Sequence, residues 1–182
     1  MSGLDKSDSL AETIAAIQAR EGVLQLQARY VDAVWRKDLD SICGCFTADA
    51  EWRIGGAVLE GRDRLYRQMS QRIFPRFRSI RMSLGSPFIE IVSGAVRANA
   101  RTLVTENNVT ADGTPILAQG TYFDRMVREH GTWKFSWRLF QTSYFGPPDM
   151  SGQFYEGNPD YGPVPNMPPL DAETINFTGM HD

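Results

Sequence analysis

Apolar residues in the first part of the chain recur at helical spacing. Ile17, Leu24 and Val31 repeat every seven residues, which predicts one apolar face of a helix. A glutamate three residues after Ser9 gives the spacing of a capping box, which marks a helix start. The pattern therefore predicts a helix over residues 9–37.

Two shorter helices are expected next, over residues 38–46 and 62–74. In the second of them Leu65, Met69 and Ile73 recur at intervals of four residues, and a proline follows that cannot continue a helix.

Beyond these helices the apolar residues change to the pattern of strands, and glycine-containing turns separate the later ones. We expect strands over residues 51–54, 79–84, 87–92, 95–107, 115–128 and 132–145. Helices followed by a run of antiparallel strands are typical of an α+β fold. The sequence thus predicts a cone, in which a curved antiparallel sheet is wrapped by three N-terminal helices and encloses a pocket.

The last part of the chain has a different composition. Residues 149–182 hold five of the ten prolines together with Phe154, Tyr155, Tyr161 and Phe177. We expect residues 1–148 to form the cone domain and the tail to pack on the cone or on a neighbouring subunit. A loosely ordered tail is the alternative.

Composition and charge narrow the class of protein. With 182 residues, 42% of them hydrophobic and 23% charged, the chain predicts one soluble globular domain. The formal net charge of −3 gives no general footprint for nucleic acid, although seven arginines lie between Arg62 and Arg81. No apolar run approaches the roughly 20 residues that cross a bilayer. We expect neither a nucleic-acid nor a membrane partner.

Few residues suit metal or cofactor chemistry. His130 and His181 have no ligand partners at workable spacing, and no glycine-rich phosphate motif occurs. Cys43 and Cys45 are too close in sequence for a useful disulfide and suggest reduced thiols in a cytoplasmic protein. We expect no metal and no organic cofactor.

Three stretches resemble a known family. Residues 30–40 (YVDAVWRKDLD), 46–52 (FTADAEW) and 130–135 (HGTWKF) are similar to the SnoaL-like branch of the nuclear transport factor 2-like superfamily. The resemblance covers roughly residues 14–147. It implies a cone-shaped fold, a small hydrophobic or aromatic ligand and a homo-oligomer, with a trimer favoured.

Within that superfamily the chain most resembles lyases of the scytalone dehydratase and hexachlorocyclohexane dehydrochlorinase type. The resemblance places Arg138 and Trp52 in the pocket, and Tyr30 where the dehydrochlorinase has a lysine. It also shows a departure, because the aspartate and histidine of the lyases' catalytic dyad fall on Trp35 and Arg81.

The candidate site combines the resemblance with the chemistry of the side chains. As catalytic residues we expect Tyr30, to exchange a proton, and Arg81 and Arg138, to bind an oxyanion or phenolate. Core packing, or an ion pair of an arginine with Asp124 or Glu106, is the structural alternative. The residues expected to contact substrate are Trp35, Trp52, Val31, Arg101, Tyr122, Asp124 and Thr142.

Three functions remain open at this point. The first is a cofactor-independent lyase acting on an aromatic or alicyclic molecule by dehydration or a retro-aldol-like elimination. The second is a binding protein that has lost the catalytic dyad, and the third is an isomerase or epoxide hydrolase of the same fold. A carboxylate in the pocket, from Asp124 or Glu106, would favour an enzyme.

Overall fold

Helices form one layer of the molecule. The structure, a computed structural model, describes residues 4–92, 94–155 and 165–172. The helices are α1 (Leu4–Arg36), α2 (Leu39–Gly44) and α3 (Arg62–Gln68). A π-helical turn (Met69–Ile73) and a 3-10 turn (Phe74–Arg76) continue α3, so the helical path includes Pro75 and ends one residue after it. No described helix combines the length and the apolar character that crossing a membrane requires.

A curved sheet forms the second layer. Its strands are β1 (Phe46–Ile54), β2 (Ala57–Glu60), β3 (Phe77–Ser79), β4 (Met82–Leu84), β5 (Phe88–Val92), β6 (Arg97–Thr110), β7 (Pro115–Glu129), β8 (Thr132–Gly146) and β9 (Gln153–Phe154). The main order is β2-β1-β8-β7-β6-β3, with β4 and β5 also on β6 and β9 on β8. The predicted α+β cone is confirmed.

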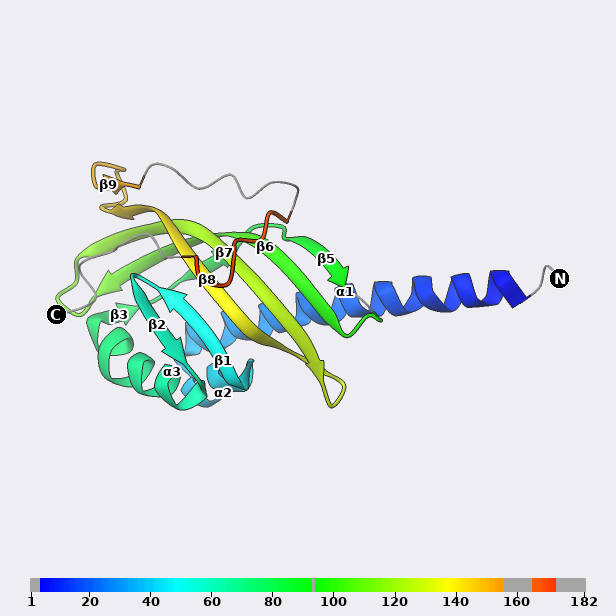
Figure 1. Ribbon diagram of the computed structural model, residues 1–182. Coiled ribbons are helices and arrows are strands. Elements are labelled where there is room, and N and C mark those ends of the chain that lie inside the picture. The colour runs from blue at the N-terminus through cyan, green and yellow to red at the C-terminus, as the bar shows by residue number, and fades with distance from the viewer. Residues whose placement is uncertain (1–3, 93, 156–164, 173–182) are drawn as a thin grey trace.

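The three long strands β6, β7 and β8 give the sheet its curvature. The pairing of β7 with β8 shifts register between Gln119 and Gly120, and again between Arg125 and Met126. Such irregularities bend a strand and increase its twist. The sheet therefore wraps over the helices, and Figure 1 shows α1, α2 and α3 on one face of it.

The face of α1 that enters the core differs from the predicted one. Ala19, Val23, Leu26 and Tyr30 are buried, at spacings of three and four residues. The predicted row of Ile17, Leu24 and Val31 lies to the side of this buried face instead, and Ile17 is 64% exposed. Both rows have helical spacing, so the sequence did not determine which of them the sheet would cover.

Two further observations on α1 concern a buried polar residue and the start of the helix. Gln27 lies in the buried row of α1, where its amide donates to Thr102 Oγ1 on β6 at 2.9 Å, so a core position carries a polar residue. The predicted start is also wrong, because α1 begins before Ser9. The carbonyl of Ser9 accepts a hydrogen bond from Thr13 Oγ1, as inside a helix.

The described part of the C-terminal tail crosses the outer face of the sheet, opposite the helices (Figure 1). Arg125 donates to the carbonyl of Pro168 at 2.6 Å, and Arg53 to that of Ala172 at 2.8 Å. Residues 165–172 thereby cover an apolar patch centred on Trp137. Tyr161, Phe177 and His181 lie outside the described residues.

The contact between α1 and the sheet supplies a first test. A Cβ atom added at Gly22 would lie 2.3 Å from Cδ1 of the buried Trp133. Glycine to alanine in a helix normally stabilises by about 1 kcal/mol. In Gly22→Ala we expect overpacking, which typically costs about 1–3 kcal/mol, to reverse that sign in urea unfolding.

Gly44→Ala is the matched control. A Cβ atom at Gly44 meets nothing within 4 Å, so this variant should unfold at the same urea concentration as the wild type or a higher one. A Gly22→Ala protein as stable as Gly44→Ala would show that α1 does not pack on Trp133 as described.

Candidate functional site

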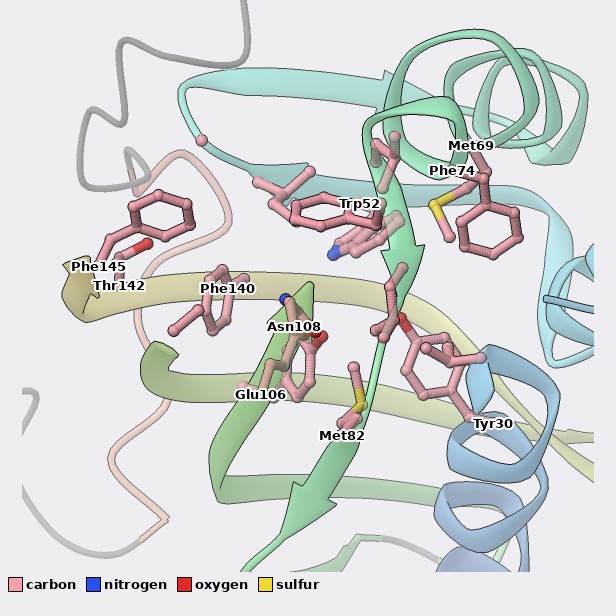
Figure 2. A pocket seen from close by; sticks show the side chains of 18 residues that line it. Tyr30, Trp52, Met69, Phe74, Met82, Glu106, Asn108, Phe140, Thr142 and Phe145 are labelled. Atoms are coloured by element: carbon pink, nitrogen blue, oxygen red, sulfur yellow. The ribbon is translucent and has the colours of Figure 1, made fainter. Parts of the chain in front are cut away.

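A cavity lies between the helices and the concave face of the sheet (Figure 2). About 50 Å³ of it is open to the centre of a water-sized sphere. Most of its wall is apolar, with residues from α1, β1, the turns after α3, and the strands β4, β6, β7 and β8. Its polar side chains are Tyr30, Trp52, Glu106, Asn108, Tyr122 and Thr142.

Glu106 is the one charged side chain among the described residues that line this cavity. It lies on β6 opposite Met82, and its Oε2 accepts a hydrogen bond from Asn108 Nδ2 at 3.0 Å. Burial raises the pKa of the Glu106 carboxyl, and the hydrogen bond from Asn108 only partly opposes this. A carboxyl in this state titrates above its ordinary range, closer to the pH at which a general base works best.

Two further polar atoms of the wall have no hydrogen-bond partner. Among the described residues, the indole Nε1 of Trp52 and the amide Oδ1 of Asn108 are buried and unpaired. Figure 2 shows Trp52 on one side of the cavity, facing Glu106 and Asn108. The cavity thus offers one free donor and one free acceptor beside a carboxylate.

Tyr30 and Tyr122 form a hydrogen-bonded pair in the wall, Tyr30 from α1 and Tyr122 from β7. Their rings meet edge to face, with centroids 6.3 Å apart. Burial raises the pKa of Tyr30 to about 12, against the opposing effect of the nearby Arg138, and raises that of Tyr122 as well. Both phenols therefore keep their protons at neutral pH and act as hydrogen-bond donors, not as bases.

Arg138 lies behind the tyrosine pair and outside the cavity lining. Its guanidinium makes two hydrogen bonds to Asp124, at 2.7 and 3.0 Å, and both side chains are fully buried. The carbon Cζ of Arg138 lies 4.3 Å from the Tyr30 ring centroid and 4.0 Å from that of Tyr122. Desolvation is the largest single effect and disfavours the charge, but the Coulombic attraction and hydrogen bonds of Asp124, together with the two tyrosines, outweigh it, so the pKa of Arg138 is raised. This geometry suits positioning of the tyrosines.

The residues predicted for the site are therefore divided among three places. Tyr30, Trp52, Tyr122 and Thr142 line the cavity. Arg138 and Asp124 form the ion pair behind it. The remaining four lie elsewhere: Val31, Trp35, Arg81 and Arg101.

Two of those four residues, Val31 and Trp35, lie on α1, while Arg81 directly precedes β4 and Arg101 lies on β6. Val31 and Trp35 line a separate surface groove beside Leu84. Arg81 is exposed, with Cζ 4.6 Å from the centroid of the Trp35 ring, and Trp35 Nε1 donates to a backbone carbonyl of β4. The guanidinium carbon Cζ of Arg101 lies 5.2 Å from the centroid of the Phe88 ring. The two positions that carry the lyases' dyad thus contact each other outside the cavity.

Sequence reasoning named Glu106 only as an alternative base and did not name Asn108. The signal was the alternation along β6, where Ala98, Ala100 and Val104 are buried at even-numbered positions. Glu106 and Asn108 continue that series, whereas the odd-numbered Arg101 points away from the cavity. No cluster of three or more His, Cys, Asp or Glu side chains that could hold a metal ion occurs in the described part of the chain.

The chain belongs to the SnoaL-like family, because the model of the SnoaL-like domain matches residues 15–138. Its cone is similar to a putative scytalone dehydratase from Novosphingobium aromaticivorans, with 19% identity, a TM-score of 0.71, and 81% of this chain and 99% of that one covered.

Two other solved structures share the fold. The hexachlorocyclohexane dehydrochlorinase LinA-type3 from Novosphingobium barchaimii is 20% identical, with a TM-score of 0.69 over 80% of this chain and 99% of that one. Rv3472 from Mycobacterium tuberculosis, a protein of unknown function, is 28% identical, with a TM-score of 0.58 over 66% and 74% of the two chains. None of the curated proteins matches.

The buried ion pair behind the site gives a second test. In Asp124→Asn the buried guanidinium loses its counter-charge, which typically costs about 3–5 kcal/mol. We expect a loss of that size in urea unfolding. The double variant Asp124→Leu, Arg138→Met removes both charges and should be more stable than Asp124→Asn.

The exposed pair of Arg36 with Asp32 is the control, since the two side chains are 52% and 63% exposed. Asp32→Asn should cost less than about 1 kcal/mol, as solvent screens such pairs. Equal effects of the two Asp→Asn substitutions would contradict the description of the pair of Arg138 with Asp124 as buried.

Proposed function

We propose that this protein is a cofactor-independent lyase that eliminates water or another small fragment from an alicyclic or aromatic small molecule. The observation that carries the proposal is the Glu106 carboxyl in an apolar cavity. Without a dyad on α1 and β4, the cone still holds a carboxylate whose raised pKa suits proton abstraction from carbon.

In the proposed reaction Glu106 removes a proton from a carbon next to an electron-withdrawing group. The electrons of the C–H bond form the new double bond, and the bond to the leaving hydroxyl breaks on the neighbouring carbon. The proton held by Glu106 then passes to the leaving hydroxide, so that water departs and the carboxylate is restored. In this proposal Tyr30, a neutral donor in the cavity wall, hydrogen-bonds the departing oxygen.

Arg138 acts through the tyrosines in this proposal. Its face contacts with Tyr30 and Tyr122 and its bonds to Asp124 fix the phenols, which makes it a positioning residue. Arg81 and Trp35 have no part in the reaction, because they lie outside the cavity.

An isomerase is the second candidate, and Glu106 favours it for the same reason. A carboxylate that takes a proton from one carbon could return it to another, and the product would keep the mass of the substrate. A thermal-shift screen of alicyclic and phenolic alcohols, ketones and acids, followed by mass spectrometry, separates the candidates. Loss of water indicates the lyase, unchanged mass with a new isomer indicates the isomerase, and binding without conversion leaves a binding protein.

Glu106→Gln tests the role of the carboxyl. Glutamine keeps the size and can still accept from Asn108 but cannot take the proton, so we expect turnover to fall about 10²–10⁴-fold with substrate still bound. In the wild type, kcat should fall as the pH drops through the raised pKa of Glu106, because only the carboxylate is active. This pH dependence should disappear in Glu106→Gln.

The stability of the Glu106→Gln variant provides a second test of the state of this carboxyl. A carboxyl whose pKa is raised by folding favours the native state at low pH and loses that contribution as the pH rises through its folded pKa. At neutral pH Glu106→Gln should therefore be at least as stable as the wild type. Glu90→Gln is the control, since Glu90 accepts from Asn99 at 2.9 Å on the surface, and it should leave turnover unchanged. If Glu106→Gln also leaves turnover unchanged, Glu106 is not the base.

We also propose that the chain forms a homo-oligomer, with a trimer expected from the family resemblance. An exposed apolar row on α1, made of Leu10, Ile14 and Ile17, supports self-association. The N-terminal part of α1 projects past the sheet (Figure 1). Light scattering should give three times the chain mass of 20.5 kDa, and Ile17→Lys should lower it more than Gln18→Lys. A wild-type mass of one chain would exclude the proposal.

A further inference from the structure

A concentrated positive charge lies in the segment from α3 to the start of β4. Residues 62–81 contain seven arginines, no lysine and a single acidic residue, Asp63. Their formal net charge is therefore +6, and because the whole chain carries −3, the other residues together carry −9. A protein that is acidic as a whole thus has one strongly basic segment, which the function proposed above does not use.

Five of these arginines are exposed and form what we call the arginine patch: Arg64, Arg67, Arg72, Arg78 and Arg81. In the described part of the chain none of the five pairs with a carboxylate, whereas Arg36, exposed on α1, pairs with two. Arg81 donates only to the backbone carbonyls of Trp35 and Ile80, at 3.4 and 3.3 Å. Guanidinium groups gathered without carboxylates repel one another, so an anionic partner would stabilise the patch.

The arginine patch is the outer surface of a segment whose inner surface lines the cavity. Met69 and Ile73 line the cavity at an interval of four residues, which in an α-helix would turn the second side chain about 40° away from the first. The π-helical turn that they bound is wound more widely than an α-helix and offsets this drift. Arg72 therefore stays on the outer side, as does Arg64 two turns earlier. A molecule bound to the patch lies against the cavity wall.

Two exposed aromatic residues accompany the arginines. Tyr66 on α3 is 41% exposed and Trp35 on α1 is 45% exposed. The Trp35 ring lies beside the guanidinium of Arg81, and the Lys37 ammonium donates to the Phe77 carbonyl, which joins the end of α1 to the turn after α3. Arginine together with amphipathic tyrosine and tryptophan is a combination typical of surfaces that lie at the interface between a membrane and water.

Nucleic acids and anionic bilayers both present phosphates to such a patch, and the cavity favours the bilayer. The wall of the cavity is mostly apolar, and part of it belongs to the same segment as the arginine patch. An apolar ligand partitions into the hydrocarbon of a bilayer, so a cone that binds through this segment meets its ligand where the ligand is concentrated. A nucleic acid offers no such supply. This step rests on the proposed function, in which the cavity takes an alicyclic or aromatic molecule.

We propose that the arginine patch binds the surface of an anionic bilayer, with Tyr66 and Trp35 at the level of the lipid head groups and the acidic remainder of the protein directed toward water. The expectation of no membrane partner rested on the absence of a spanning segment, which a surface contact does not require. Each arginine close to an anionic surface raises the partition coefficient about fivefold. Salt weakens the contact, because it screens exposed charges.

Sedimentation of the whole chain with vesicles tests the proposal. At about 50 mM salt the protein should sediment with vesicles of phosphatidylcholine and phosphatidylglycerol, but not with phosphatidylcholine alone, and about 300 mM salt should release it. The double variant Arg64→Gln, Arg72→Gln removes two charges of the patch and should lower the partition coefficient about 25-fold.

The matched control is the double variant Arg97→Gln, Arg128→Gln. It removes two exposed charges on the strand ends beside the β7–β8 turn, which lies at the other end of the sheet from α3 (Figure 1). The net charge changes by the same amount as in the patch variant. The partition coefficient should fall by less than about threefold, because these charges lie far from the bilayer and are screened.

Trp35 reports the orientation of the bound protein. It is the exposed one of the four tryptophans, since Trp52, Trp133 and Trp137 are only 2%, 4% and 4% exposed. Lipid brominated close to the head group should quench part of the tryptophan emission of the vesicle-bound wild type. Trp35→Phe should remove this quenching and leave sedimentation nearly unchanged, because phenylalanine keeps an aromatic ring at the interface.

The outcomes separate this inference from the proposed function. Absence of sedimentation with anionic vesicles at low salt, or equal losses in the two double variants, overturns the inference even if the protein converts a substrate. Vesicle binding without quenching of Trp35 also overturns it, because another surface then faces the bilayer. Binding of a single-stranded thymidine oligonucleotide in place of vesicles assigns the patch to nucleic acid. Vesicle binding through the patch by a protein that converts no compound supports this inference and argues against the lyase.

Discussion

Arg138 places a positive charge in the middle of the core, where neither its side chain nor that of Asp124 reaches solvent. The two residues are direct neighbours across β7 and β8, so a slip of this strand pair would separate the charges. Breaking such a pair leaves a buried charge without a partner, which is among the more costly changes a core can undergo. The guanidinium also contacts the ring of Tyr30, which fixes the rotation of α1 on the sheet. Strand register and helix placement therefore depend on one ion pair.

The same pair determines the electrostatics of the cavity. Arg138 is bonded to Asp124 and lies outside the cavity lining, and burial raises the pKa of the Glu106 carboxyl that faces the cavity. The tyrosines stay protonated for a related reason, since burial outweighs the opposing effect of Arg138. The result is a carboxyl group with a raised pKa in the same cavity wall as two phenols that keep their protons at neutral pH.

Local signals explain how much of this the sequence could predict. The β6–β7 and β7–β8 turns contain Gly113 and Gly131, both with positive φ, and these turn signals placed the long strands correctly. The family resemblance supplied the cone. The sequence did not determine which row of α1 faces inward, or whether the odd-numbered or the even-numbered residues of β6 do. Each choice depends on a partner distant in sequence, such as Thr102 for Gln27, so spacing alone could not decide it. The sequence named Glu106 beside Asp124 as a possible pocket carboxylate, and only the structure shows that Glu106 lines the cavity while Asp124 pairs with Arg138.

The positions of Trp35 and Arg81 in the structure give a physical explanation for the difference from the lyases that the chain resembles. A tryptophan and an arginine occupy the dyad positions, and their 4.6 Å cation–π contact lies on the outside of α1, where neither can reach a ligand in the cavity. The carboxyl group that lines the cavity, Glu106, lies on β6, which pairs with β4, the strand that follows Arg81. A curved sheet makes this arrangement feasible, because inward-facing positions on several strands converge on one cavity and any of them can carry a carboxylate. In the function proposed above, the cone would therefore keep its pocket while the residue that takes the proton lies on a different strand from the dyad positions.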